Sequence, residues 1–250
     1  MNALLPPPFT PRTELDRQLA RHGHAVLSPQ AIGEALDVPL HGLQALLPFW
    51  ERLPHDAHLK DGGRYRRRRH ACFVASQGEV ALVPHRAHWQ PVEYNALHGG
   101  IERWFEPAEP AMLALPAWNR LLLWLAERAD LLRGARQRWF IEAHPFRIDT
   151  AEGIGRPTPE GAHRDGVDLV MVMLLARERV KGGETRVFEA DGPNGQRFTM
   201  EQPFTTLLLD DARVIHETTP IQPAGGGYGH RDTLVVTLRR DGFQGPDSAH

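Results

Sequence analysis

Apolar residues recur at helical spacing in the first part of the chain. Ser28 followed by Pro29 has the order of a helix start, because serine caps free backbone N–H groups and proline is tolerated in the first turn. Leucines then recur every three or four positions over the next twenty residues, with Pro39 and Pro48 as expected breaks. A second apolar helix is predicted over residues 118–132.

Beyond position 136 the apolar residues form short runs bounded by Gly, Pro, Asn or Asp, a pattern typical of strands. The predicted strands cover residues 139–148, 167–175, 185–188, 205–209, 213–216 and 234–239. With 250 residues and no internal repeat or low-complexity linker, the chain is expected to form one domain. Residues 1–135 form its helical N-terminal part in this prediction, and residues 136–240 form its β core.

This order of elements predicts a mainly β fold with an N-terminal helical layer packed on one face. A double-stranded β-helix, which is a cupin-like jelly roll, is the architecture that encloses a site between two such sheets. The fold class is therefore expected to be a jelly roll.

Composition limits the classes of partner and the cellular compartment expected for this protein. Arginine and lysine number 29 against 31 acidic residues, and the formal net charge of −2 argues against a nucleic-acid-binding protein. Cys72 is the only cysteine, so no internal disulfide can form, which fits a reducing compartment. The apolar stretches are too interrupted to span a membrane, and a proline triplet stands where a signal peptide needs its apolar core. We expect a cytoplasmic protein that acts on a small molecule; the pattern does not specify its oligomeric state.

The strongest chemical signal is His163 and Asp165 followed by His216. Two imidazoles and one carboxylate can fill one face of an octahedral Fe(II) ion and leave the opposite face for a chelating ligand and dioxygen. On a strand, His163 and Asp165 would point to the same side. A second His-x-Asp copy begins at His230, but only the terminal His250 follows it, so we predict the metal site at the first copy.

Arg231 follows a glycine-rich turn at residues 225–229 and can reach the same site. A guanidinium binds a carboxylate through two parallel hydrogen bonds, and Thr233, on the same strand face, can donate a third. We predict that this pair binds the far carboxylate of 2-oxoglutarate. The alternative is an arginine in an ordinary salt bridge.

Substrate contacts are predicted from two segments. A basic run from Arg64 through Tyr65 and Arg66 to His70 can offer one or two side chains to a substrate carboxylate, while the rest form a solvated face. Glu142 and His144 share one face of the strand at 139–148 and are further candidates. No catalytic side chain beyond the metal centre is predicted.

The motifs at residues 157–166, 182–185, 210–216 and 231–233 resemble those of bacterial Fe(II)/2-oxoglutarate dioxygenases of the L-isoleucine hydroxylase type. That family also includes the BsmA-type proteins linked to biofilm and stress, and the resemblance is densest over residues 139–239. It implies a double-stranded β-helix whose metal triad holds Fe(II) and whose arginine holds 2-oxoglutarate, with dioxygen as cosubstrate.

The resemblance further implies hydroxylation of a free aliphatic amino acid, with succinate and CO2 as coproducts. Two alternatives stay open at this point. One is a non-catalytic jelly roll that binds a metal or a small ligand in a stress or biofilm response. The other is a dioxygenase that acts on a peptide or a nucleic acid.

Overall fold

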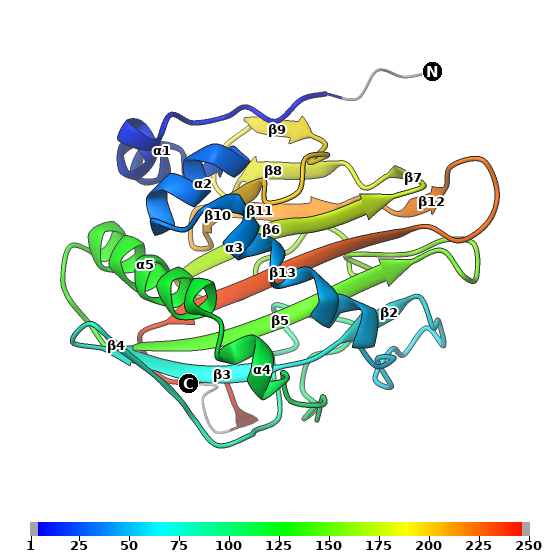
Figure 1. The fold of residues 1–250 in the computed structure, drawn as a ribbon, viewed down its shortest axis with the longest axis horizontal. Coiled ribbons are helices and arrows are strands. Elements are labelled where there is room, and N and C mark those ends of the chain that lie inside the picture. Colours follow the sequence, from blue (N-terminus) through cyan, green and yellow to red (C-terminus); the bar gives the residue numbers. More distant parts are fainter. Residues whose placement is uncertain (1–4, 247–250) are drawn as a thin grey trace.

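The computed structural model describes residues 5–246, which are built around a large antiparallel β-sheet (Figure 1). Its strands lie in the order β1 (His24–Leu27), β10 (Thr206–Asp210), β6 (Leu169–Glu178), β13 (His230–Arg239), β5 (Trp139–Asp149), β3 (Ala71–Ser76) and β4 (Glu79–Leu82). The eighth strand, β2 (Arg66–Arg68), pairs with the part of β5 that β3 leaves free. The long strands β5, β6 and β13 are adjacent and form the centre of the sheet.

A smaller sheet contains β11 (Val214–Thr218), β8 (Thr185–Glu189) and β9 (Gly195–Phe198), in that order. A two-stranded ribbon contains β7 (Val180–Gly182) and β12 (Ile221–Pro223). Val170 and Leu174 on β6 pack against Val187 and Phe198 of the small sheet, so the two sheets share an apolar layer. The predicted fold class, a mainly β jelly roll with N-terminal helices, is confirmed.

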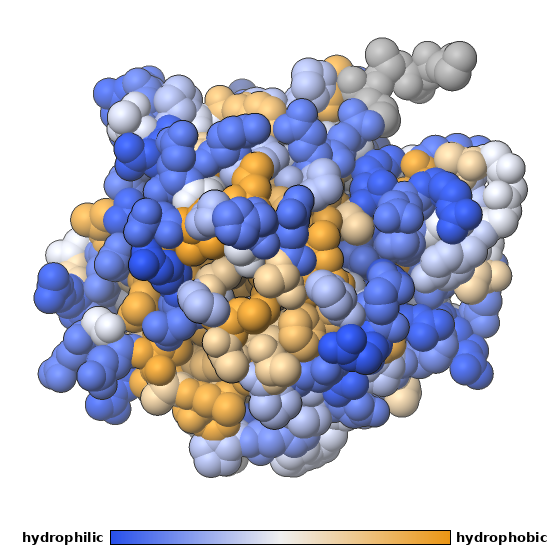
Figure 2. Space-filling view, in the orientation of Figure 1, coloured by the Kyte–Doolittle hydropathy of each residue, from blue (hydrophilic) through white to orange (hydrophobic). Residues whose placement is uncertain are grey.

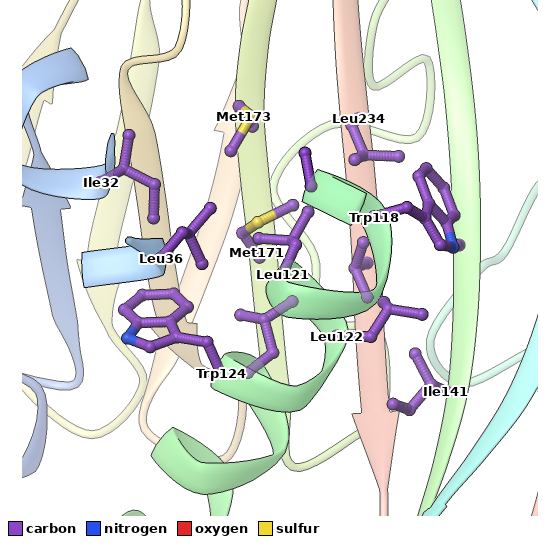
Figure 3. Packing of buried hydrophobic residues seen from close by; sticks show 14 of the residues in the cluster. Ile32, Leu36, Trp118, Leu121, Leu122, Trp124, Ile141, Met171, Met173 and Leu234 are labelled. Atoms are coloured by element: carbon purple, nitrogen blue, oxygen red, sulfur yellow. The ribbon is translucent and has the colours of Figure 1, made fainter. Parts of the chain in front are cut away.

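Helices cover the other face of the large sheet (Figure 1). They are α1 (Leu15–His22), α2 (Pro29–Leu36), α3 (Leu40–Gln44), α4 (Pro110–Leu113) and α5 (Pro116–Arg133), with 3-10 turns η1 (Arg12–Glu14) and η2 (Leu47–Arg52). Leu121 on α5 packs with Ile141 on β5, Met171 on β6 and Leu234 on β13 in the main core (Figure 3). Figure 2 shows apolar side chains gathered in the middle of this helical face, within a polar periphery.

Strand alternation separates the two faces of the large sheet. On β5, Ile141 and Ala143 face the helices, whereas Glu142 and His144 line a cavity on the opposite side. The same alternation on β13 sends Leu234 to the helical core. The cavity therefore lies between the large sheet and the small one.

The predicted helix start at Ser28 and the second predicted helix are confirmed. The Ser28 hydroxyl oxygen accepts a hydrogen bond from the backbone N–H of Ala31, and Pro29 occupies the first turn of α2. The helix ends at Asp37, which adopts a left-handed conformation, and Pro39 precedes the short α3. The predicted helix at 118–132 corresponds to α5.

The structure also differs from the expected pattern. Strands β1, β2, β3 and β4 lie within the N-terminal part expected to be helical, and all four join the large sheet. Strand β13 begins at His230, four residues before the predicted start, because its first residues are polar and lacked the apolar signal. The segment containing His163 and Asp165 is irregular rather than a strand, so the prediction of a shared strand face for these two residues is wrong.

Candidate metal centre and cosubstrate pocket

The structure brings His163, Asp165 and His216 together. His216 lies on β11, and its backbone forms an isolated antiparallel bridge with His163, with N–H···O distances of 2.9 and 3.0 Å. The Asp165 carboxylate oxygens lie 3.8 Å from Nε2 of His163 and 3.8 Å from Nε2 of His216. One donor atom from each residue lies within 4.8 Å of the others, which suits three ligands of one ion.

The hydrogen bond of His163 and the neutral state of His216 suit metal binding. The Nδ1 of His163 lies 2.9 Å from the carbonyl oxygen of Gly161, which leaves Nε2 free for a metal. Burial and the nearby His163 lower the pKa of His216 to about 3, so this imidazole is neutral near pH 7. Burial also lowers the pKa of His163, but the carboxylates of Asp165 and Glu160 outweigh this effect and raise it.

A buried carboxylate, rather than strand geometry, positions Asp165. Asp211 lies in the turn between β10 and β11. Its carboxylate oxygens accept hydrogen bonds from the backbone N–H groups of Asp165 at 2.9 Å, Gly166 at 2.7 Å and Val167 at 3.1 Å. Gly166 has a positive φ of 74°, which glycine adopts without strain. From the other side, the Gln244 side chain donates to the carbonyl oxygens of Asp165 and Gly166.

Asp211→Asn should therefore weaken Fe(II) binding about ten- to a hundredfold, as loss of a group that supports a metal ligand typically does. The asparagine keeps the size of the side chain, but its NH2 group cannot accept the loop N–H groups. Iron affinity is measured by titration of the metal-free protein, with the exposed Asp191→Asn as control. Equal affinities in the two variants would show that Asp211 does not support the site.

Arg231 and Thr233 lie on the cavity face of β13, opposite Ile148 and Phe146 of β5. Arg231 is only 3% exposed, and its Nε and Nη2 atoms have no hydrogen-bond partner within residues 5–246. Burial and the neighbouring Arg177 lower its pKa to about 10. Because an unpaired buried charge is costly, this guanidinium fits the carboxylate of a bound cosubstrate.

The second His-x-Asp copy points to the opposite side. Its His230 and Asp232 form a further group of donor atoms with Glu51, again within 4.8 Å. Arg147, however, lies between the two carboxylates, with Nη2 at 2.6 Å from Glu51 and 2.7 Å from Asp232. This group is an ion-pair cluster on the helical face.

The substrate candidates separate into two sets. Arg66, Glu142 and His144 line the cavity together with the metal triad. Arg64 is exposed, and its backbone N–H contacts Glu152 instead. Tyr65 is buried beside the cavity lining and donates its hydroxyl to Asp61 at 2.6 Å, so neither of the first two residues of the basic run reaches the cavity.

Sequence reasoning did not single out several polar residues of the cavity wall, although the basic run that it considered for substrate contact includes one of them. They are Arg68, His88, Gln90, Asn95 and Arg103. Alternation along β2 could have found the first, because Arg66 and Arg68 share a strand face. The other four lie in a connection without regular periodicity, which a backbone bridge between His88 and Arg103 holds in place.

A second group of potential metal ligands lies in this wall. His70, His88, Glu142 and His144 are all buried and place their donor atoms within 4.8 Å of one another, so by donor type and spacing the group is able to bind a metal. One oxygen of Glu142 accepts hydrogen bonds from His70 Nε2 at 2.8 Å and His88 Nδ1 at 2.6 Å. Burial raises the pKa of Glu142, but these imidazoles outweigh it and lower the pKa, while burial lowers the pKa of His88 to about 3.

The comparisons agree with this geometry. The family model of the 2OG-Fe dioxygenases matches residues 47–237, and the chain belongs to this family. The family uses Fe(II) and 2-oxoglutarate with dioxygen, so these are the cofactors and the cosubstrate of the class.

Among solved structures, the chain is similar to a BsmA homologue from Methylobium petroleophilum PM1, with 54% identity, a TM-score of 0.90 and coverage of 95% of this chain and 96% of that one. IDO from Bacillus thuringiensis shares the fold at 18% identity, with a TM-score of 0.74 and coverage of 96% and 100%. The Fe(II)/α-ketoglutarate-dependent dioxygenase TqaL shares it at 19% identity, with a TM-score of 0.69 and coverage of 92% and 86%. No curated protein matches the chain. Within the described residues, no helix has both the length and the apolar character needed to cross a membrane.

Proposed function

We propose that this chain is a 2-oxoglutarate-dependent amino-acid hydroxylase of the L-isoleucine hydroxylase type. In this proposal His163, Asp165 and His216 hold Fe(II), and Arg231 with Thr233 holds 2-oxoglutarate. The observation that supports this proposal is that one cavity is lined by His163, Asp165 and His216, whose donor atoms lie close enough to share an ion, and by the buried Arg231 guanidinium, whose Nε and Nη2 have no hydrogen-bond partner within residues 5–246. A non-catalytic metal-binding jelly roll has no need for such a guanidinium, whose burial costs free energy.

Bound iron and 2-oxoglutarate supply the oxidising power to hydroxylate an unactivated C–H bond, with succinate and CO2 as coproducts. The protein contributes position and a dry environment. Arg231 fixes one end of the cosubstrate, and Asp211 fixes the loop that carries Asp165. Val172 and Val235 form an apolar part of the same cavity wall and exclude water from it.

The proposed substrate is a free, small apolar L-amino acid. Its support is the resemblance described above and a cavity enclosed between two sheets that offers guanidinium groups and aromatic rings. Arg66 on β2 supplies one such guanidinium group, and Phe146 on β5 supplies one such ring. We also propose that the enzyme works in the cytoplasm, where the buried thiol of Cys72 would remain reduced.

The proposal is tested with purified protein, Fe(II), ascorbate and 2-oxoglutarate. Isoleucine, leucine and methionine are compared with capped dipeptides and methylated oligonucleotides, following succinate and a product heavier by one oxygen atom. We expect one of the free amino acids to accelerate succinate formation and to gain the oxygen. Turnover of the oligonucleotide, or of the capped peptide alone, would reject the substrate class, and no succinate under any condition would favour the non-catalytic role in stress or biofilm response.

A further inference from the structure

We propose that the cavity wall formed by Arg68, Arg103, Glu142 and His88 is a subsite for the charged head of an α-amino acid. The two guanidinium groups receive its carboxylate, and Glu142 with the Nε2 of His88 receives its ammonium group. This inference rests on the proposed function and deepens it, because it states which end of the substrate the protein recognises and with which residues.

Within residues 5–246, neither of the two buried arginines forms a salt bridge with an acidic side chain. Arg68 is 4% exposed and donates from Nη2 to the Nδ1 of His144 at 2.6 Å, a neutral acceptor. Arg103 is 2% exposed and donates from Nη2 to the amide oxygen of Gln90 at 2.9 Å, also a neutral acceptor. The Nε atoms of both have no partner within the described residues. Arg66 differs, because Asp56 pairs with it at 2.7 Å.

Two unpaired guanidinium groups in one buried wall attract an anion. Burying an uncompensated charge is costly, and a bound carboxylate would compensate it. The ring of Phe105 lies 3.7 Å from the Arg68 guanidinium carbon and that of Phe146 lies 4.2 Å from it, so this cation is held between two aromatic faces rather than by a carboxylate. A planar carboxylate is the ligand that matches guanidinium donors in number and geometry.

The neighbouring acceptors suit an ammonium group. His88 gives its Nδ1 proton to Glu142, so its Nε2 carries a lone pair, and no hydrogen bond within residues 5–246 occupies that atom. Both His88 and Glu142 line the cavity. A protonated amine has three donors and no acceptor, and it therefore complements a carboxylate and a bare imidazole nitrogen.

Hydrogen bonds, rather than a metal, account for the packing of this histidine cluster. The two contacts of the Glu142 oxygen, 2.8 Å to His70 and 2.6 Å to His88, are the distances of charge-assisted hydrogen bonds. Arg68 donates to the Nδ1 of His144, so this atom is not free to bind a metal. A metal at this cluster is thus the competing outcome of the test.

Gln90 connects the head subsite with the proposed metal centre. Its amide oxygen accepts from Arg103, and its amide nitrogen donates to the Asp165 carboxylate at 3.1 Å. The head subsite and a proposed iron ligand are thus separated by a single side-chain amide. An amino acid with its head at Arg103 can therefore direct its side chain toward the proposed metal centre.

The test measures binding and turnover of matched ligands by the full chain loaded with Fe(II) and 2-oxoglutarate. L-Leucine, N-acetyl-L-leucine and L-leucinamide are titrated by calorimetry without oxygen, together with L-isoleucine and L-methionine. We expect at least one free amino acid to bind, and blocking either its amino or its carboxyl group to weaken binding at least about tenfold, because each change removes one charge-assisted contact.

Arg103→Gln and Glu142→Gln should each raise the KM for the amino acid about ten- to a hundredfold. Arg103→Lys, which keeps the charge, should retain part of the affinity, while the exposed Arg136→Gln should behave as wild type. Melting temperature and iron content identify any variant that fails to fold. If Arg103→Gln does not fold, the comparison of free and blocked amino acids on the wild-type protein still tests the head subsite.

Different results would reject the proposed hydroxylase activity and the proposed head subsite. Absence of succinate would reject the hydroxylase, although calorimetry would still show whether the wall binds amino acids. Succinate formation with equal use of leucine and its blocked forms would reject the head subsite alone. A second equivalent of iron or zinc per chain that disappears in Glu142→Gln would also overturn it and assign the cluster to a metal.

Discussion

Replacing His216 with alanine should reduce 2-oxoglutarate turnover more than about a hundredfold, because loss of a metal ligand exceeds the tenfold to hundredfold cost of losing a supporting group. His216 is 8% exposed, and its ring lies 4.6 Å from that of His163. Iron retained after gel filtration and succinate formation are the two measurements. His163→Ala and Asp165→Ala should give the same result.

The matched control is His22→Ala, since His22 is exposed at the end of α1, outside the cavity lining. All four variants should keep a cooperative melting transition, because the metal ligands lie outside the main apolar core. Full iron content and full turnover in the His216 variant would remove that residue from the metal site and leave the triad without its third ligand.

Arg231→Ala should raise the dissociation constant for 2-oxoglutarate about ten- to a hundredfold while iron binding stays nearly intact. The estimate follows from roughly 1.5 to 3 kcal/mol for hydrogen bonds to a charged group. Without cosubstrate, the variant should be as stable as the wild type or more stable, because it no longer buries a cation whose Nε and Nη2 lack partners in the described structure. Calorimetry of the iron-loaded protein and thermal melting measure the two effects.

Arg147→Ala is the control for Arg231→Ala, because Arg147 is a buried arginine on the opposite face of the sheet. That side chain pairs with Asp232 and Glu51 on the helical face, so its removal should cost about 3 to 5 kcal/mol of stability and leave the affinity of the folded protein for 2-oxoglutarate unchanged. If Arg231→Ala left the 2-oxoglutarate affinity unaltered, Arg239, which also lines the cavity, would become the candidate anchor.

Sequence patterns predicted the elements whose apolar residues keep a regular period. Helix α5 and strands β5, β6 and β10 were found because their buried residues produce a clear apolar signal. Strand β2 was missed because all three of its residues are arginines, and two of these are buried toward the cavity. A strand that presents charge to a binding site has the composition of a solvated segment, and only the fold distinguishes the two.

The candidate site was predicted only where chemistry is local in sequence. The residues His163 and Asp165 form a short motif, His216 ends an apolar run, and Arg231 follows a glycine-rich turn. Arg103 and His88 carry no such signal, since their place in the cavity depends on pairing between distant parts of one connection. The support of Asp165 by Asp211 was equally hidden, because hydrogen bonds from a side chain to a loop backbone leave no periodic pattern.

The turn and strand at residues 210–218 carry both Asp211 and His216, whereas residues 83–109 supply His88 and Arg103. Segment 210–218 of the proposed metal centre and segment 83–109 of the proposed head subsite can therefore change independently in evolution, apart from Gln90, which contacts both Arg103 and Asp165. Libraries that vary residues 83–109 while keeping Gln90 and residues 210–218 fixed are the economical starting point for redirecting this scaffold to other acids.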